Sequence, residues 1–187
     1  INLYRATRKK FVLLNLFPIL FFRVNNDSLI KDEKSITRSF QYHTFSTALL
    51  GELYLLTGMN FILKTFLNAT YLIADKMMPN GRTLYIGRGQ EQIFGYSTLL
   101  YSLELAQLFL KKNFFEKKIM KLLKLLTHFQ RKDGSFPLVL NEDEKNLSFH
   151  QTLSSKTLPG WYLYNTIFDY LPFAGVYLFE SYRISQN

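Results

Sequence analysis

The sequence predicts an all-α protein built from helical hairpins, and two observations carry this prediction. Five segments have apolar residues at helical spacing and end at turn signals, whereas few stretches alternate as strands do. The first, third and fifth segments are apolar nearly all round, and the fourth carries many charges along one side. Since a helix that is apolar all round is buried, we expect buried and surface helices to alternate as inner and outer layers.

The composition fits one globular domain. The chain has 187 residues, of which 48% are hydrophobic and 17% aromatic, enough for a packed core. It has no cysteine, which excludes disulfides and metal–thiolate sites but does not fix the compartment. The net charge of +9 favours an anionic partner. The basic residues form no stripe interleaved with aromatics, so nucleic acid is not expected.

The N-terminal stretch is expected to differ from the rest of the chain. Basic residues within 1–10 precede an apolar run at 11–22 that Pro18 interrupts. No small-residue cleavage site follows, and the run is too short to cross a bilayer, so no transmembrane segment is expected. We expect an extended segment over residues 1–34 and a helical domain over residues 35–187. The start at Ile1 rather than Met indicates a fragment of a longer protein. The localisation stays open between cytoplasm and periplasm, since no clear signal peptide is present.

Capping residues set the expected bounds of the helices. Ser35 or Thr37 would begin the first helix, and Gly58 would end it. Asn60 and Asn113 would cap the second and the fourth. The expected helices cover residues 36–57, 61–78, 90–111, 114–131 and 161–183.

The fourth helix is predicted to be an amphipathic surface helix. Its apolar side carries Phe115, Ile119, Leu122, Leu126 and Phe129. Its lysines at positions 117, 118, 121 and 124 lie mostly off that side and are interpreted as the solvated face. A long connection over 132–160 follows, in which residues 136–140 would form a short strand. Pro172 is expected to kink or break the fifth helix.

Polar and aromatic side chains gather near the starts of the three inner helices. In alternating hairpins every inner helix runs the same way, so these starts should meet at one end of the domain. Three separate clusters are therefore expected to converge there. They are Gln41, Tyr42 and His43; Arg88, Gln90, Glu91, Gln92 and Tyr96; and Trp161, Tyr162, Tyr164, Asn165, Asp169 and Tyr170.

The second cluster lies in the stretch around which the chain is organised, residues 80–101. This stretch carries Arg82 and Arg88 in a short loop, and Gly87 and Gly89 beside Arg88 would let the backbone approach a ligand. The loop lacks the third glycine of a dinucleotide loop and the G-K-S/T of a phosphate loop. Two interpretations stay open, a ligand site and a turn into a helix with solvated charges.

Residues 130–136, Q-R-K-D-G-S-F, resemble the Q-x-x-D-G-S-[FW] turn of α/α-toroid proteins, which links an outer helix to the next inner one. Tyr42-His43 together with G-R-G-Q-x-Q-I-F-G-Y at 87–96 resemble the carbohydrate-active members, such as heparinase-like polysaccharide lyases and uronyl epimerase-like proteins. The resemblance covers roughly residues 36–183. An intact toroid needs more hairpins than this chain holds, so the resemblance implies an incomplete ring that the rest of a parent chain completes.

The resemblance implies a cleft that binds or acts on an acidic, uronate-containing poly- or oligosaccharide. A uronate lyase or epimerase removes the proton alpha to a carboxylate, and it needs a base and groups that stabilise the developing charge. The candidate bases are His43, Tyr42 and Tyr96. The candidate substrate contacts are Arg82, Arg88, Gln90, Gln92 and Asn165, and Trp161 and Tyr162 would either stack on a sugar face or anchor the last helix.

Other interpretations stay open. A glycoside hydrolase needs two carboxylates across the scissile bond, for which Glu91, Asp133 and Asp169 are the candidates, and Asp169 is otherwise a substrate contact. His43 also fits a hydrogen-bonded structural histidine. A helical scaffold that binds a glycan or protein without catalysis is a third class. No cofactor is expected, and no metal, because no H-x-x-x-H or acidic pair at ligand spacing occurs.

Overall fold

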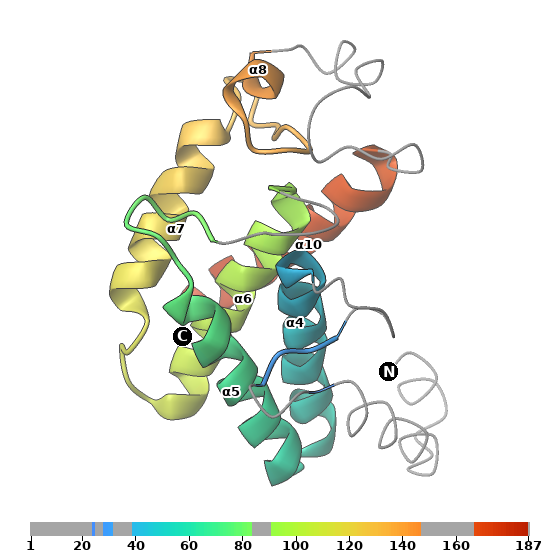
Figure 1. Ribbon diagram of the computed structural model, residues 1–187, viewed down its shortest axis with the longest axis vertical. Helices are drawn as coiled ribbons and strands as arrows, with labels where there is room; N and C mark the ends of the chain where they lie inside the picture. Colours follow the sequence, from blue (N-terminus) through green and yellow to red (C-terminus); the bar gives the residue numbers. More distant parts are fainter. Residues whose placement is uncertain (1–23, 25–27, 32–38, 84–90, 147–166, 187) are drawn as a thin grey trace.

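The computed structural model describes residues 24, 28–31, 39–83, 91–146 and 167–186 (Figure 1). The fold of these residues is all-α, which confirms the predicted class. Their helices are α4 (Phe40–Thr57), α5 (Asn60–Asp75), α6 (Ile93–Leu110), α7 (Glu116–Phe129), α8 (Glu142–Lys145) and α10 (Ile167–Ser185). The predicted strand at 136–140 is wrong, since only Val139 pairs, with Gln92, in an isolated antiparallel bridge.

Two predicted helix caps are displaced in the structure and one is confirmed. Gly58 ends α4 in the left-handed conformation at φ 66°, as expected of a C-terminal glycine. Asn60 is instead the first residue of α5, and Asn113 lies before the N-cap of α7, which is Phe115. Both helices start without a side-chain cap, so packing rather than capping sets these bounds.

The first helix is capped by a residue other than the two expected. Ser39 accepts a hydrogen bond from the backbone N–H of Tyr42 at 3.4 Å and begins α4. Ser35 and Thr37 lie outside the described residues, as does nearly all of the expected N-terminal segment 1–34.

The helices alternate in direction. Figure 1 shows α4, α6 and α10 running broadly the same way, and α5 and α7 running in the opposite direction. Helix α6 lies at the centre and contacts α4, α5, α7 and α10. The alternating directions agree with the predicted hairpins, and α6 is buried as expected of an inner helix. Helix α10 differs from the prediction, because much of its apolar surface is exposed, and closure into a toroid stays a prediction.

Helix α6 is buried nearly all round. Among its 18 residues, 13 are buried, including the polar Ser97, Thr98 and Ser102. Each of these hydroxyls donates to a backbone carbonyl within its own helix, so burial leaves them satisfied. Of the described helices, α6 alone is long and apolar enough to cross a membrane, but 72% of that span is buried inside the protein. Its place in the core is sufficient to account for its composition.

Helix α7 has the predicted amphipathic form. All five residues of its expected apolar side are buried, and Leu125 joins them. Lys117, Lys121 and Lys124 are exposed, as predicted for the solvated face. Lys118 differs, because it is half-buried and its ammonium donates to the carbonyl of Ala74 at the end of α5, at 2.6 Å. This bond ties the two outer helices together.

Helix α10 packs on α6 by one side only. Ala174, Tyr177 and Ser181 are buried, whereas four large apolar side chains are 50–62% exposed: Phe173, Val176, Phe179 and Tyr182. Pro172 lies inside the helix, which continues through it to Ser185, so the helix does not break there, and a kink at Pro172 stays a prediction.

The D-G-S-F turn generates the first prediction. Gly134 has φ 83°, and a Cβ there would meet no atom within 4 Å, so only backbone strain opposes a side chain. Gly134→Val should therefore lower the free energy of unfolding by roughly 1 kcal/mol or more. Gly134→Asn, whose side chain tolerates this conformation, should lose clearly less. Urea unfolding of both variants tests this, and equal losses would contradict it.

A second prediction concerns Glu104, a carboxylate in α6. Burial raises the pKa of Glu104 above its ordinary value. A raised folded-state pKa means that ionised Glu104 destabilises the fold above that pKa and does so no longer below its unfolded pKa. Glu104→Gln should hence raise the Tm at pH 7 by about 1–2 °C, and the gain should shrink as the pH falls toward 4. A gain that is independent of pH would contradict this.

Candidate functional site

The starts of the inner helices meet at Phe94. Its ring stacks on Tyr170 of α10, with centroids 4.8 Å apart, and meets Tyr42 of α4 edge-on at 5.8 Å. Phe45 of α4 also contacts Phe94, at 6.2 Å. The starts of the three helices therefore meet as predicted, with an aromatic cluster at the centre, whereas convergence of the full polar clusters stays a prediction. Phe94 stands in an apolar run, where nothing local distinguishes it from other core residues.

Three candidate site residues meet beside this point. Arg82 Nη1 donates to Glu91 Oε2 in a salt bridge, and Tyr96 Oη donates to the same oxygen at 2.6 Å. Arg82 Nη2 donates to the carbonyl of Leu140 at 3.0 Å, and its guanidinium lies 5.2 Å from the ring centroid of Phe129. The side chains of Arg82 and Glu91 are 26% and 27% exposed, so the pair is partly open to solvent.

The backbone of Glu91 adopts an unusual conformation. Its φ is 58°, in the left-handed region that non-glycine residues seldom occupy. Two backbone hydrogen bonds of 2.8 Å hold it, from Ile93 N to Leu138 O and from Leu140 N to Glu91 O. Such strain costs about 1–3 kcal/mol and persists where the surroundings impose it, often at functional sites. Here it aims the Glu91 carboxylate at Arg82.

Gln92 and Tyr96 do not face an open cleft. Gln92 is 1% exposed, and its carbonyl accepts a hydrogen bond from Gln41 Nε2 at 2.9 Å. Tyr96 is fully buried, so its hydroxyl reaches the site only through Glu91. Both residues position the start of α6, and a direct substrate contact by either would need a different conformation.

His43 has the environment of a structural histidine. It is fully buried, its Nδ1 accepts from the N–H of Ile30 at 3.1 Å, and its Nε2 lies 3.0 Å from the carbonyl of Ala69. Nε2 must therefore carry the proton, which makes the imidazole neutral with both nitrogens occupied. This geometry favours the structural interpretation over a catalytic base.

The D-G-S-F turn uses its carboxylate internally. Asp133 Oδ1 accepts from the backbone N–H and the hydroxyl of Ser135, at 2.9 and 2.7 Å. The hydrogen bonds from Ser135 hold the pKa of Asp133 below its usual range. A lowered pKa keeps the group ionised, which argues against Asp133 as the acid of a hydrolase.

A buried carboxylate that the sequence did not single out stabilises the same loop. Glu144 Oε1 accepts from Leu138 N at 2.8 Å, and its Oε2 from Val139 N at 3.3 Å. The backbone carbonyl of Glu144 also accepts a hydrogen bond from Arg131 Nη2 at 2.8 Å. Burial lowers the pKa of Arg131, and the nearby carboxylates oppose that change. This network fixes residues 138–140, which in turn hold Glu91.

The remaining candidates are only partly described. Tyr42 is half-buried at the start of α4 with its ring against Phe94, and Asp169 lies in the first turn of α10. The candidates that lie outside the described residues are Arg88, Gln90, Trp161, Tyr162 and Asn165. Within the described ranges, no group of three or more histidine or acidic side chains could hold a metal ion.

Comparison of the chain with protein-family models, with curated proteins and with solved structures found no significant match. The site must therefore be interpreted from its own geometry.

The third prediction tests the central pair. In a double-mutant cycle of Arg82→Met and Glu91→Gln, the coupling free energy should be about 1 kcal/mol, because the pair is charge-assisted and only partly exposed. Equilibrium urea unfolding of the two single variants and the double variant measures it. Lys76 and Asp75, an exposed adjacent pair, provide the control and should couple by less than about 0.5 kcal/mol. Strict additivity at Arg82 and Glu91 would contradict the assignment.

Proposed function

We propose that the chain is a carbohydrate-active domain that binds or acts on an acidic polysaccharide, at the end where α4, α6 and α10 begin. The observation that carries the proposal is the partly exposed Arg82–Glu91 pair, held by a strained backbone beside the converging helix starts. Backbone strain that fixes a polar side chain at a surface is more common at binding sites than elsewhere.

The pair retains groups for a ligand. Both hydrogen bonds to Glu91 go to Oε2, and no described residue bonds Oε1. Arg82 uses Nη1 and Nη2 for one bond each, and a guanidinium has five N–H donors. A sugar hydroxyl can donate to Glu91 Oε1, while the remaining N–H groups of Arg82 can donate to a ring oxygen, hydroxyl or carboxylate. The +9 charge adds general attraction for a polyanion.

The products released from a polysaccharide would distinguish the three classes of activity. A uronate lyase creates an unsaturated sugar and raises ultraviolet absorbance, whereas a hydrolase releases reducing ends without that change. A binder retains affinity and releases neither product. We favour the lyase or epimerase class, because the sequence segments assigned to this end carry more arginine, glutamine and tyrosine side chains than paired carboxylates.

A helical scaffold is the second candidate, and α10 is the observation that favours it. Phe173 meets Phe45 of α4 edge-on at 5.8 Å, whereas Val176, Phe179 and Tyr182 leave an apolar face 57–62% exposed. In the expected incomplete ring, the next hairpin of a longer parent chain would cover this face. A chain that binds no glycan, and whose α10 face becomes protected from hydrogen exchange in the parent, would favour the scaffold.

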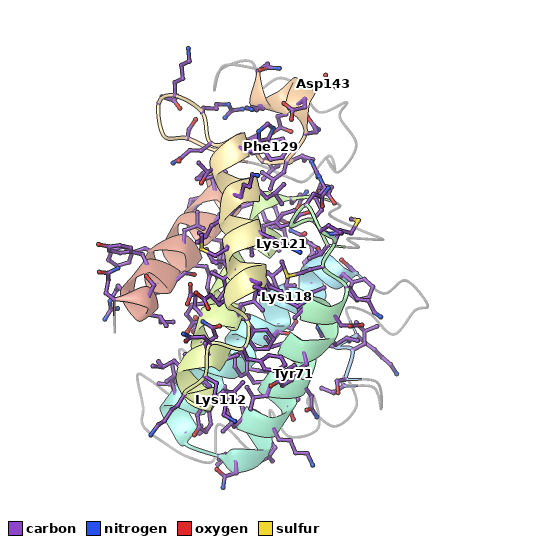
Figure 2. All side chains as sticks on the ribbon, turned by 90° about the vertical axis from the view of Figure 1, so that its left-hand side faces the viewer. Tyr71, Lys112, Lys118, Lys121, Phe129 and Asp143 are labelled. Atoms are coloured by element: carbon purple, nitrogen blue, oxygen red, sulfur yellow. The ribbon has the colours of Figure 1, made fainter. Side chains whose placement is uncertain are left out.

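The fourth prediction separates a specific site from general attraction. Arg82→Ala should weaken binding of a uronate oligosaccharide by at least about tenfold, because a charge-assisted contact is lost. Lys112→Ala changes the net charge equally but lies at the opposite end of α7 from Phe129, over which Arg82 lies (Figure 2). It should change the affinity by less than about twofold at moderate salt.

Titration calorimetry on the full chain, with circular dichroism to confirm folding, makes the comparison. Glu91→Gln is the second variant, since it keeps the size of the side chain. Equal, small losses for Arg82→Ala and Lys112→Ala would leave only non-specific attraction and overturn the proposal.

A further inference from the structure

A groove lies between the turn that follows α5 and the outer side of α7. Its volume is about 310 Å³, and its lining residues are Pro79, Asn80, Lys121, Lys124, Leu125 and His128. Figure 2 shows Lys121 on α7 beside the segment that follows α5. The groove therefore joins two parts of the chain some 40 residues apart, which is why the lysines look only solvated in the sequence.

The wall formed by the turn is held firmly in place. Met78 N donates to Arg82 O at 2.7 Å, and Gly81 N donates to Met78 O at 3.0 Å. Gly81 has φ 86°, and a Cβ there would lie 2.4 Å from the carbonyl oxygen of Lys121. The turn thus touches the backbone of α7 at Gly81, and the space beside this contact is the groove.

The groove is lined by two lysines whose ammonium groups have no acceptor among the described residues. Lys121, Lys124 and His128 lie at helix positions i, i+3 and i+7, on one side of α7. Neither lysine has a hydrogen bond or salt bridge among the described residues, in a stretch where like charges three apart repel. Asn80 Oδ1 accepts from Arg82 N at 3.1 Å, so the Nδ2 amide of Asn80 remains to donate.

The neighbouring carboxylates already have other partners. Glu142 Oε1 lies 2.6 Å from His128 Nε2, and Glu142 Oε2 lies 3.8 Å from Lys145 Nζ. The hydrogen bond from His128 is the main cause that lowers the pKa of Glu142, so this carboxylate stays ionised toward His128. Glu91 is bonded to Arg82, and the acid of α7 itself, Glu116, stands in its first turn. Lys121 and Lys124 are left for an external anion.

We propose that this groove binds the phosphate or sulfate group of a small molecule, a site that does not depend on the proposed polysaccharide function. Two ammonium groups and an amide suit an ester oxyanion with three acceptor oxygens, which carries up to two negative charges in a phosphate ester and one in a sulfate ester. Leu125 and Pro79 supply an apolar wall for the carbon skeleton of an ester. The volume lies at the lower end of ordinary ligand sites and exceeds the needs of a bare oxyanion.

The test uses titration calorimetry of the full chain at about 50 mM salt, where surface charges are incompletely screened. The probes are inorganic phosphate, inorganic sulfate, glucose 6-phosphate, glucose 6-sulfate and glucose. Tighter binding of an ester than of its free anion supports an esterified ligand, and equal binding supports the free anion. Binding of none of the four anions at millimolar concentration overturns the site.

Two matched sets of variants locate the binding. The double change Lys121→Gln and Lys124→Gln should weaken anion binding by at least about tenfold. The control, Lys112→Gln with Lys117→Gln, alters the net charge equally outside the groove and should change it by less than about twofold. Equal losses for the two pairs would reduce the effect to net charge and overturn the proposal.

A substitution in the turn gives an independent measure. Asn80→Asp keeps the acceptor for Arg82 N but replaces the Nδ2 donor with negative charge, so it should abolish anion binding while the chain stays folded. Asn68→Asp, an exposed site on α5, is its matched control and should leave the affinity nearly unchanged. Unaltered binding by the Asn80→Asp variant would contradict the site.

Discussion

The described fold depends on one constraint, which is that α6 has almost no solvent-facing side. A helix of 18 residues with 13 buried needs neighbours all round, and α4, α5, α7 and α10 provide them. Burial of its apolar surface is the largest stabilising contribution available to these residues, at about 25 cal/mol per Å². It also explains why the helices alternate: α5 and α7 return the chain so that α4, α6 and α10 can lie side by side. Gly58 is a consequence, since it ends α4 where the chain must reverse, and the D-G-S-F turn redirects the chain a few residues after α7 has ended.

The start of α6 transmits this constraint to the candidate site. Because α6 cannot shift, its first residues are fixed against residues 138–140, and Glu91 takes up the strain at φ 58°. Glu144 fixes residues 138–140 in turn, by accepting hydrogen bonds from two of their backbone N–H groups. The buried carboxylate of Glu144 thereby stabilises the position of Glu91, which is partly exposed. Arg82 joins the system from the preceding turn and binds both Glu91 and Leu140. The geometry of the pair is therefore set by the packing of the domain and does not depend on a mobile surface contact.

The sequence predicted the features that depend on residues close together in the chain, which are the helices and the turns. Helical periodicity gave the class, the alternation of layers and the apolar side of α7, and the glycines at 58 and 134 were correctly expected to need special backbone conformations or to end a helix. The polar residues were harder, because the sequence does not reveal a partner in space. His43 hydrogen-bonds to the backbone of Ile30 and Ala69, and Tyr96 donates a hydrogen bond to Glu91. Side chains that the sequence assigned to a cleft are therefore buried with their polar atoms bonded. Lys121 and Lys124 show the converse, since only the packing of the 79–81 turn gives them a groove.

The turn at 79–81 separates the cations of this region into two kinds. Arg82, at its end, has its charge compensated by Glu91, and Lys145 lies 3.8 Å from a carboxylate oxygen of Glu142. Such cations orient a ligand through directed N–H donors, but they contribute little net attraction. Lys121 and Lys124 have no such compensation among the described residues, so they contribute charge without fixed direction. One segment thus places a directional, neutral pair beside a pair of uncompensated charges. A ligand at the first pair would be held mainly by directed hydrogen bonds, whereas an anion at the second would be held mainly by charge.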